Sequence, residues 1–466
     1  MRKNPAIAVF DIGKTNKKLL VFDGQYNLVR ELTVGFNEIE DDDGYPCEDL
    51  AALTTWMLEQ FRVLKNDPEY EIKAVNFSTY GASLVYINKA GKPVGYLYNY
   101  LKPYPQETWD AFCRAQGNVS AFCEATSTPL MGHLNAGMQL YWLRTKKPGL
   151  FKETATVLHF PQYLSFLFTG KRIAEMTNVG CHSAMWDFHQ MRYHSWLKTE
   201  QLHEKLAPII PGSNAVVIED ATSGQKVAVG TGLHDSSAAI IPYLCCFDGP
   251  FVILSTGTWA ISLNPFNQVL PDAADLSKGG LSYLSYKGIP VKTSMLFAGN
   301  EHDQQVKRIA AHFSLASGFY KTVLPDREML LPLFEKTNKE SADEAAAIPA
   351  GATTPGRFQF RDLQRFQTAG AAYHQLLKDI IEQQKISTQL VLDGKGARQL
   401  YVDGGFCKNE LYMQLLATAF PETKVYATTM TQGTALGAAL AIHDHWNHQP
   451  VPASLISLKA YAAVRL

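Results

Sequence analysis

Two short apolar runs near the start of the chain are separated by a polar segment that contains a glycine. The runs cover residues 7–10 and 19–22, and the segment between them reads Asp11-Ile12-Gly13-Lys14-Thr15-Asn16-Lys17-Lys18. Apolar runs of this length on either side of a glycine turn are typical of two strands joined as a hairpin. The pattern therefore predicts that the chain opens with a β-hairpin.

The same pattern returns in the second half of the chain. Residues 251–254 and 259–263 are largely apolar, and Ser255-Thr256-Gly257-Thr258 lies between them. The two turn glycines are a little over half the chain length apart, so the repetition predicts two similar halves. A two-lobed protein with an interlobe cleft follows, and we place the lobes at residues 1–240 and 241–466.

Helical spacing alternates with strand patterns in both halves. Residues 49–64 and 368–384 carry apolar side chains about 3.6 positions apart, which predicts helices. The apolar runs at 74–77 and 399–402 favour strands. Strands that alternate with helices predict an α/β fold for each lobe.

Composition indicates a folded protein with small partners. Of 466 residues, 46% are hydrophobic and 19% are charged, while 33 glycines and 23 prolines are ordinary numbers. The net charge of -1 supplies no field for binding nucleic acid or an anionic membrane. Asp11 interrupts the first apolar run before a signal peptide forms, and no segment reaches the roughly 18 apolar residues that span a bilayer. We therefore expect a cytoplasmic protein.

Two features are expected to be structural. The seven cysteines are an odd number, scattered and without a C-x-x-C pair, which favours reduced thiols over a disulfide framework or a zinc site. The acidic run Asp41-Asp42-Asp43 is interpreted as a solvated loop in preference to a metal site.

The two predicted turns are candidates for phosphate binding. Gly, Ser and Thr leave the backbone N–H groups of a turn accessible, so two such turns would hold a polyphosphate. An ordinary hairpin is the alternative for either turn alone. Asp11 stands at the end of the first strand, where a carboxylate would hold hydrated Mg²⁺ or cap its own turn.

Two further segments combine a strand end with a helix start. Gly404 and Gly405 follow a predicted strand and precede a helical run at 411–419, which would let a flat or phosphorylated ligand lie against bare backbone. Asp235 precedes an apolar run at the junction of the halves. There it would accept a proton from a substrate hydroxyl, or it would cap a helix.

These motifs together resemble the FGGY family of carbohydrate kinases, within the wider fold of sugar kinases, actin and heat-shock chaperones. The family's opening D-x-G-T-T-x-x-K is similar to residues 11–18, and its second phosphate turn to residues 255–259. Its adenosine segment resembles Gly404-Gly405 through Asn409, and T-A-L-G-A-A stands at 434–439. The resemblance implies two ribonuclease H-like lobes, with sugar binding mainly in the first and ATP binding mainly in the second. The ATP-binding residues that it implies are Gly13, Lys14, Thr15, Asn16, Thr256, Gly257, Thr258, Gln304, Gly404, Gly405 and Asn409.

Within the family, the L-rhamnulose kinase branch is the most similar. His234-Asp235-Ser236 resembles the H-D-T of that branch, which implies that Asp235 is the catalytic base. The sugar contacts that the resemblance implies are Gly81, Ser83, His234, Asp235 and Ser236. The aromatic residues Tyr80 and Trp186 would either cover the apolar face of a sugar or belong to the core, which is the commoner place for such residues.

The chain departs from the family at several places. Ser78 and Ser83 stand where the branch has acidic residues, and Lys14 replaces a Thr beside the phosphates. Gln432 stands where a Glu commonly precedes T-A-L-G, and residues 98–102 lack an expected Asp and Arg. The segments implied in nucleotide binding therefore match the family's motifs better than the segments implied in sugar binding do.

The expected function is Mg²⁺- and ATP-dependent phosphorylation of a small sugar, such as the ketose L-rhamnulose or a related sugar. The alternative is a nucleotide-dependent binding or regulatory protein of the same fold with reduced catalysis. We expect no nucleic acid or membrane partner, and the oligomeric state is left open, with a homodimer as one alternative.

Overall fold

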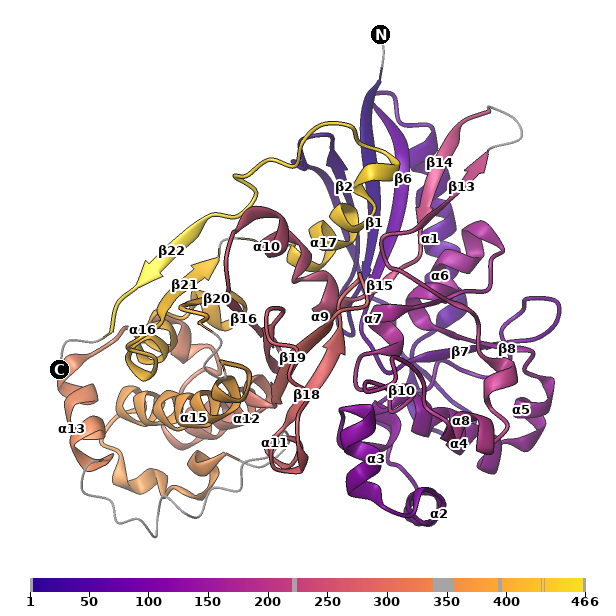
Figure 1. The fold of residues 1–466 in the computed structure, drawn as a ribbon. Coiled ribbons are helices and arrows are strands. Elements are labelled where there is room, and N and C mark those ends of the chain that lie inside the picture. The colour runs from indigo at the N-terminus through magenta and orange to yellow at the C-terminus, as the bar shows by residue number, and fades with distance from the viewer. Residues whose placement is uncertain are drawn as a thin grey trace. The chain divides into compact units, whose positions relative to one another are not determined.

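The chain folds into two compact units. The computed structural model describes residues 3–219, 224–337, 356–392, 396–428, 430 and 432–463, and Figure 1 gives their elements. The first unit comprises Met1–Phe247, Ser282–Pro290 and Gln432–Leu455, and the second comprises Asp248–Leu281, Val291–Thr431 and Ile456–Leu466. A late segment of the chain thus belongs to the first unit.

The first unit is built on a mixed sheet with the order β13-β14-β6-β1-β2-β3, in which β15 also pairs with β6. β1 pairs antiparallel with β2 and parallel with β6, which confirms the predicted opening hairpin. The strands are β1 (Asn4–Ile12), β2 (Lys17–Asp23), β3 (Leu28–Val34), β6 (Tyr70–Thr79), β13 (Ala215–Glu219), β14 (Lys226–Gly230) and β15 (Leu233–His234).

Helices and short strand pairs complete the first unit. The helices are α1 (Leu50–Lys65), α2 (Gln106–Gln116), α3 (Val119–Thr126), α4 (Ala136–Lys146), α5 (Pro148–Glu153), α6 (Phe160–Thr169), α7 (Met176–Val179), α8 (Trp196–Thr199), α9 (Asp235–Ala238), α10 (Ile241–Cys246) and α17 (Gly433–Ala441). The short strands pair as β4 (Ile39–Glu40) with β5 (Pro46–Cys47), β7 (Leu84–Ile87) with β8 (Thr156–His159), β9 (Ala174–Glu175) with β12 (Ile209–Ile210), and β10 (Trp186–Asp187) with β11 (Arg192–Tyr193).

The second unit repeats the arrangement of hairpin and parallel strand. β16 (Val252–Thr256) pairs antiparallel with β17 (Ala260–Asn264) and parallel with β20 (Gln399–Gly404). The remaining strands are β18 (Gly280–Leu284), β19 (Pro290–Leu296), β21 (Lys424–Thr428) and β22 (Leu458–Tyr461), and the order is β18-β19-β17-β16-β20-β21-β22. The helices are α11 (Ala273–Ser277), α12 (Ala298–His312), α13 (Arg327–Thr337), α15 (Ala369–Leu392) and α16 (Glu410–Ala419). The predicted fold class, two α/β lobes, is confirmed, whereas the lobe bounds at residues 1–240 and 241–466 stay a prediction.

Helix α1 illustrates how the sequence pattern produces the structure. Asp49 caps the helix, since its carboxylate accepts a hydrogen bond of 2.9 Å from the backbone N–H of Ala52. Leu53, Met57 and Phe61 are buried on one face, because a spacing of three or four residues brings side chains to the same side of a helix. Each contributes about 1.5–3 kcal/mol by leaving water.

All seven cysteines are free thiols, in agreement with the sequence analysis. Cys47, Cys123 and Cys181 are buried, and Cys245 is exposed. Among the helices of the described residues, each is too short or too polar to cross a membrane.

Replacing Gly437 with alanine should destabilise the protein by about 1–3 kcal/mol. A Cβ atom at this position would lie 1.9 Å from the carbonyl oxygen of Ala238, so α17 and α9 would have to separate. Chemical denaturation of the variant measures the loss. The control is Gly149→Ala, where the added Cβ meets no atom within 4 Å, and an equal effect of the two substitutions would contradict the close contact.

Candidate active site

The first predicted phosphate turn is held by a buried lysine. The N–H of Gly13 donates to the carbonyl of Asn16 at 2.9 Å and closes the turn that contains Lys14 and Thr15. The ammonium of Lys17 donates to the Lys14 carbonyl at 3.0 Å and pairs with Glu48 at 2.9 Å. Because both side chains of this pair are buried, losing one would leave an uncompensated charge. The sequence analysis did not identify this clamp.

The side chain of Lys14 is occupied by protein carboxylates. Its ammonium lies 2.7 Å from Glu38 and 3.5 Å from Glu48. The lysine that replaces the family's threonine is therefore partly neutralised within the first unit.

Asp11 is a half-buried carboxylate near the end of β1. Its Oδ2 accepts a hydrogen bond of 2.8 Å from the hydroxyl of Thr434, which lies 423 positions later in the chain. Burial is the main cause that raises the pKa of Asp11 to about 6, and the negative charge of Asp235 adds to it. Two carboxyl groups of the first unit therefore interact electrostatically.

Asp235 occupies the first position of α9, directly after β15. Its Oδ1 accepts hydrogen bonds from the backbone N–H of Ser236 at 2.6 Å and from the hydroxyl of Ser236 at 3.2 Å. The side chain is 33% exposed, so a ligand has access to it. Desolvation by the surrounding protein raises the pKa of Asp235 to about 6, which is suited to a base that works near neutral pH.

Only some of the predicted sugar-binding residues are shown to lie close to one another. Gly81 lies against the ring of His234, where a Cβ atom would be 3.0 Å from Nε2, and His234 Nε2 is 3.3 Å from Asp235. Burial lowers the pKa of His234 to about 3, so its imidazole is neutral. Ser83 is buried, and its hydroxyl has no hydrogen-bond partner of standard geometry.

Aromatic side chains near Asp235 differ from those expected. The ring of Tyr283 lies 5.3 Å from that of His234, and the charge of Asp235 raises the pKa of both Tyr100 and Tyr283, in addition to burial. Tyr80 packs against Tyr100 with ring centroids 5.8 Å apart. Trp186 instead packs against Tyr193, which offers no link to Asp235.

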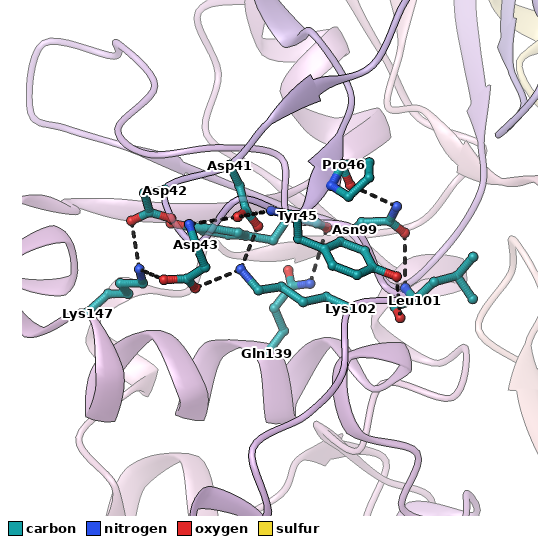
Figure 2. Close-up of polar contacts among 11 residues, drawn as sticks. Asp41, Asp42, Asp43, Tyr45, Pro46, Asn99, Leu101, Lys102, Gln139 and Lys147 are labelled. Atoms are coloured by element: carbon teal, nitrogen blue, oxygen red, sulfur yellow. Dashed lines mark hydrogen bonds and ion pairs between the residues drawn. The ribbon is translucent and has the colours of Figure 1, made fainter.

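The segment that contains Tyr100 is anchored by the acidic run. Figure 2 shows Lys102 between Asp41 and Asp43, at 2.6 and 2.7 Å, and Lys147 paired with Asp43. Asp41 is buried, so the expectation of a solvated loop is wrong for this residue. Lysines from distant parts of the chain supply the countercharge, which the sequence spacing did not reveal.

The second unit contains a cavity of about 570 Å³ at the second predicted phosphate turn. Four of the predicted ATP-binding residues line it: Gly257, Thr258, Gly405 and Asn409. The other lining residues, most of which the sequence analysis did not identify, are Gly299, His302, Asp303, Tyr320, Lys321, Val323, Leu324, Phe406, Lys408 and Glu410. Aromatic rings together with lysines and glycine backbone suit a ligand that has a flat ring and phosphates.

Two other predicted residues shape the cavity without lining it. The Thr256 hydroxyl donates to the carbonyl of Asp403 and accepts from the N–H of Phe406, the latter at 3.0 Å. Gly404 has a φ of +82°, and a Cβ atom there would lie 1.8 Å from the Thr256 carbonyl oxygen. Only glycine fits this contact.

A polar network joins two of the residues that line the cavity. The amide of Asn409 donates to the hydroxyl of Tyr373 at 2.6 Å, and that hydroxyl is 3.1 Å from Nε2 of His302. Gln304 takes no part in it, because its amide donates to Asn300 at 2.7 Å on α12. Gln304 is also absent from the residues that line the cavity.

Two family models match the sequence. The N-terminal domain of the FGGY family of carbohydrate kinases matches residues 6–242, and the FGGY carbohydrate kinase C-terminal domain matches residues 248–450. Together these matches cover most of the chain.

The chain is also similar to individual proteins. A rhamnulokinase of Halalkalibacterium halodurans is 25% identical over 479 residues, covering 94% of this chain and 93% of that protein. A rhamnulokinase of Yersinia pestis is 24% identical, with 55% of this chain and 53% of that protein covered, so this match spans about half of its length. The crystal structure of a carbohydrate kinase from Novosphingobium aromaticivorans aligns with a TM-score of 0.77 at 21% identity, over 98% of this chain and 97% of that chain. This likeness confirms the predicted two-lobed fold class.

Proposed function

Because the chain belongs to the FGGY family of carbohydrate kinases, we propose that it transfers the γ-phosphoryl group of ATP to a hydroxyl of a small sugar. The observation that carries the proposal is Asp235, a partly exposed carboxylate with a pKa of about 6 beside a neutral histidine. These are the properties of a general base for a hydroxyl group.

The proposed reaction uses Asp235 to accept the proton of the sugar hydroxyl. The oxygen of that hydroxyl then forms a bond with the γ-phosphorus, the bond from phosphorus to the bridging oxygen breaks, and ADP leaves. The hydrogen bonds from Ser236 fix the carboxylate, and His234 remains neutral and able to bind a hydroxyl. Gly81 leaves the ring of His234 uncovered by a side chain.

The cavity of the second unit is the proposed ATP site. Its glycines expose backbone to the phosphates, and Lys321 and Lys408 supply positive charge. In the first unit, Asp11 fits the role of holding hydrated Mg²⁺, since its carboxylate is close enough to Asp235 for their charges to interact and a cation would offset that repulsion. Bound Mg²⁺ would neutralise phosphate charge.

We propose a neutral ketose, such as L-rhamnulose or a related sugar, as the substrate. Full-length similarity to a protein named rhamnulokinase supports this class. The uncharged Ser78 and Ser83, together with the neutral imidazole of His234, favour a sugar without an acidic group. Ser78 and Ser83 replace carboxylates that would accept hydrogen bonds from sugar hydroxyls. This replacement favours a sugar that differs from the branch's usual substrate in the hydroxyl that faces these serines.

A panel of ketoses and polyols, assayed for ATP consumption with Mg²⁺, tests the proposal. We expect sugar-dependent formation of ADP with one preferred ketose. ATP binding without phosphorylation of any sugar in the panel would instead support the alternative, a nucleotide-dependent binding or regulatory protein. The substituted sugar positions favour that alternative, whereas the presence of both Asp11 and Asp235 favours the kinase.

The pH profile should follow the carboxyl groups. Because the pKa of Asp11 and of Asp235 is raised to about 6, both become protonated as the pH falls below this value. We expect kcat/KM for the preferred sugar to be level above pH 7 and to fall at least tenfold for each unit well below pH 6. Steady-state kinetics between pH 5 and 8 measures this, and a level profile down to pH 5 would contradict the assignment of Asp235 as the base.

A further inference from the structure

A cluster of possible metal ligands lies beside Asp235 in the first unit. The sulfur of Cys181 and one ring nitrogen each of His182 and His234 lie within 4.8 Å of one another, and all three side chains are buried. A second group, Asp41 to Asp43, has comparable spacing, but Lys102 and Lys147 already pair with it. Within the described residues, no lysine or arginine is recorded in an ion pair with the cysteine and histidine cluster.

A hydrogen bond orients the imidazole of His182 for metal binding. Nδ1 of His182 lies 2.9 Å from the carbonyl of Leu134, so Nδ1 carries the proton and Nε2 keeps its lone pair. A metal-binding histidine commonly donates its other N–H to a carbonyl in this way. The lone pair on Nε2 of His182 is thus free to bind a metal ion.

Gly81 leaves room between the ligand atoms. A Cβ atom built on Gly81 would lie 3.0 Å from His234 Nε2 and 3.3 Å from Cys181 Sγ. A metal ion bound to those atoms, at about 2.1 and 2.3 Å, would occupy the space next to this missing side chain.

Asp235 marks an entrance to the cluster. Its Oδ1 lies 3.3 Å from His234 Nε2. The three ligands are buried, whereas Asp235 is 33% exposed. An ion would therefore enter past the carboxylate.

We propose that Cys181, His182 and His234 form a binding site for Zn²⁺ or a cation of similar softness, with the fourth position open to water. One thiolate and two imidazoles match the ligand preference of zinc and not that of Mg²⁺, which prefers oxygen. The thiol of Cys181 must lose its proton to the solvent when the sulfur–zinc bond forms. Zinc at this site would hold His234, the neighbour of Asp235, and the expected consequence, inhibition of sugar phosphorylation, rests on the proposed function.

Titration of the full chain with Zn²⁺ alone, in competition with a chromophoric chelator, tests binding without reference to activity. We expect one site in the wild type and a loss of affinity of at least about 100-fold in Cys181→Ala, since even loss of a group that only supports a ligand costs 10–100-fold. Cys123→Ala is the matched control, because Cys123 is also a buried free thiol and is not in the cluster. Co²⁺ in place of Zn²⁺ should give a sulfur-to-metal charge-transfer band that Cys181→Ala lacks.

A second variant keeps the test decisive if Cys181→Ala does not fold. His182→Asn removes Nε2 but keeps an amide that can donate to Leu134, and asparagine tolerates the positive φ of 28° at this position. We expect the same loss of zinc affinity. Equal zinc affinity in the wild type and in whichever of these two variants folds would overturn the proposal. Zinc binding by a protein whose zinc-free form phosphorylates no sugar would refute the proposed function and leave the metal site standing.

Discussion

The Asp235→Asn variant should lose at least about 100-fold in kcat while it keeps its fold and its affinity for ATP. Asparagine has nearly the same shape as aspartate, and its amide oxygen can still accept the hydrogen bond from the Ser236 N–H. It cannot accept a proton from a sugar hydroxyl near neutral pH. Steady-state kinetics and calorimetric titration with ATP measure the two effects separately.

The control for this prediction is Asp110→Asn. Asp110 lies on the surface of α2, where its carboxylate accepts a hydrogen bond from the side-chain amide of Gln106. We expect its kcat to equal that of the wild type. If Asp235→Asn retained activity within a few fold, Asp235 would be a helix-start residue without a chemical role.

A larger side chain should affect ATP binding at one glycine of the second unit and stability at another. A Cβ atom on Gly257 meets its nearest atom, the carbonyl oxygen of Trp259, at 3.8 Å, whereas one on Gly299 would lie 1.9 Å from the carbonyl oxygen of Gly257. Gly257→Val should therefore weaken ATP binding about 10- to 100-fold by obstructing the cavity, with stability unchanged. Gly299→Ala should lower the free energy of unfolding by about 3 kcal/mol.

Chemical denaturation and ATP titration of both variants separate these effects. Gly318→Ala is the control, because a Cβ atom there meets nothing within 4 Å. Loss of stability in Gly257→Val equal to that in Gly299→Ala would mean that the turn requires glycine for its own conformation. The absence of a close contact at Gly257 would then not predict the effect of the substitution on stability.

The sequence predicted the strands of both hairpins because their apolar runs are buried in the middle of each sheet. It predicted less of α15, which continues to Leu392 although the apolar pattern weakens after Ile381. In this last part, buried polar side chains bond to one another: Gln384 donates to Thr388 at 2.9 Å, and Ser387 donates to Ser294 at 3.0 Å. A helix whose buried face is polar does not produce the hydrophobic spacing on which the prediction relied.

For the candidate site, the sequence identified residues within motifs but not their distant partners. Asp11 was selected from its position before a glycine turn, whereas its hydrogen bond from Thr434 depends on the tertiary fold. Cys181 and His182 are adjacent, but the third member of their cluster lies more than fifty residues later, so the search for short cysteine spacings did not find it. The proposed roles of these residues remain predictions.

The close contact between Gly437 and Ala238 has a consequence for the order of synthesis. Residues 432–455 belong to the first unit but leave the ribosome after nearly all of the second unit has been made. Until then, Asp11 lacks the Thr434 hydroxyl and α9 lacks the helix that packs on it. A nascent chain therefore holds an incomplete first unit while the second unit is made, and the first unit acquires its final form only when residues 432–455 emerge.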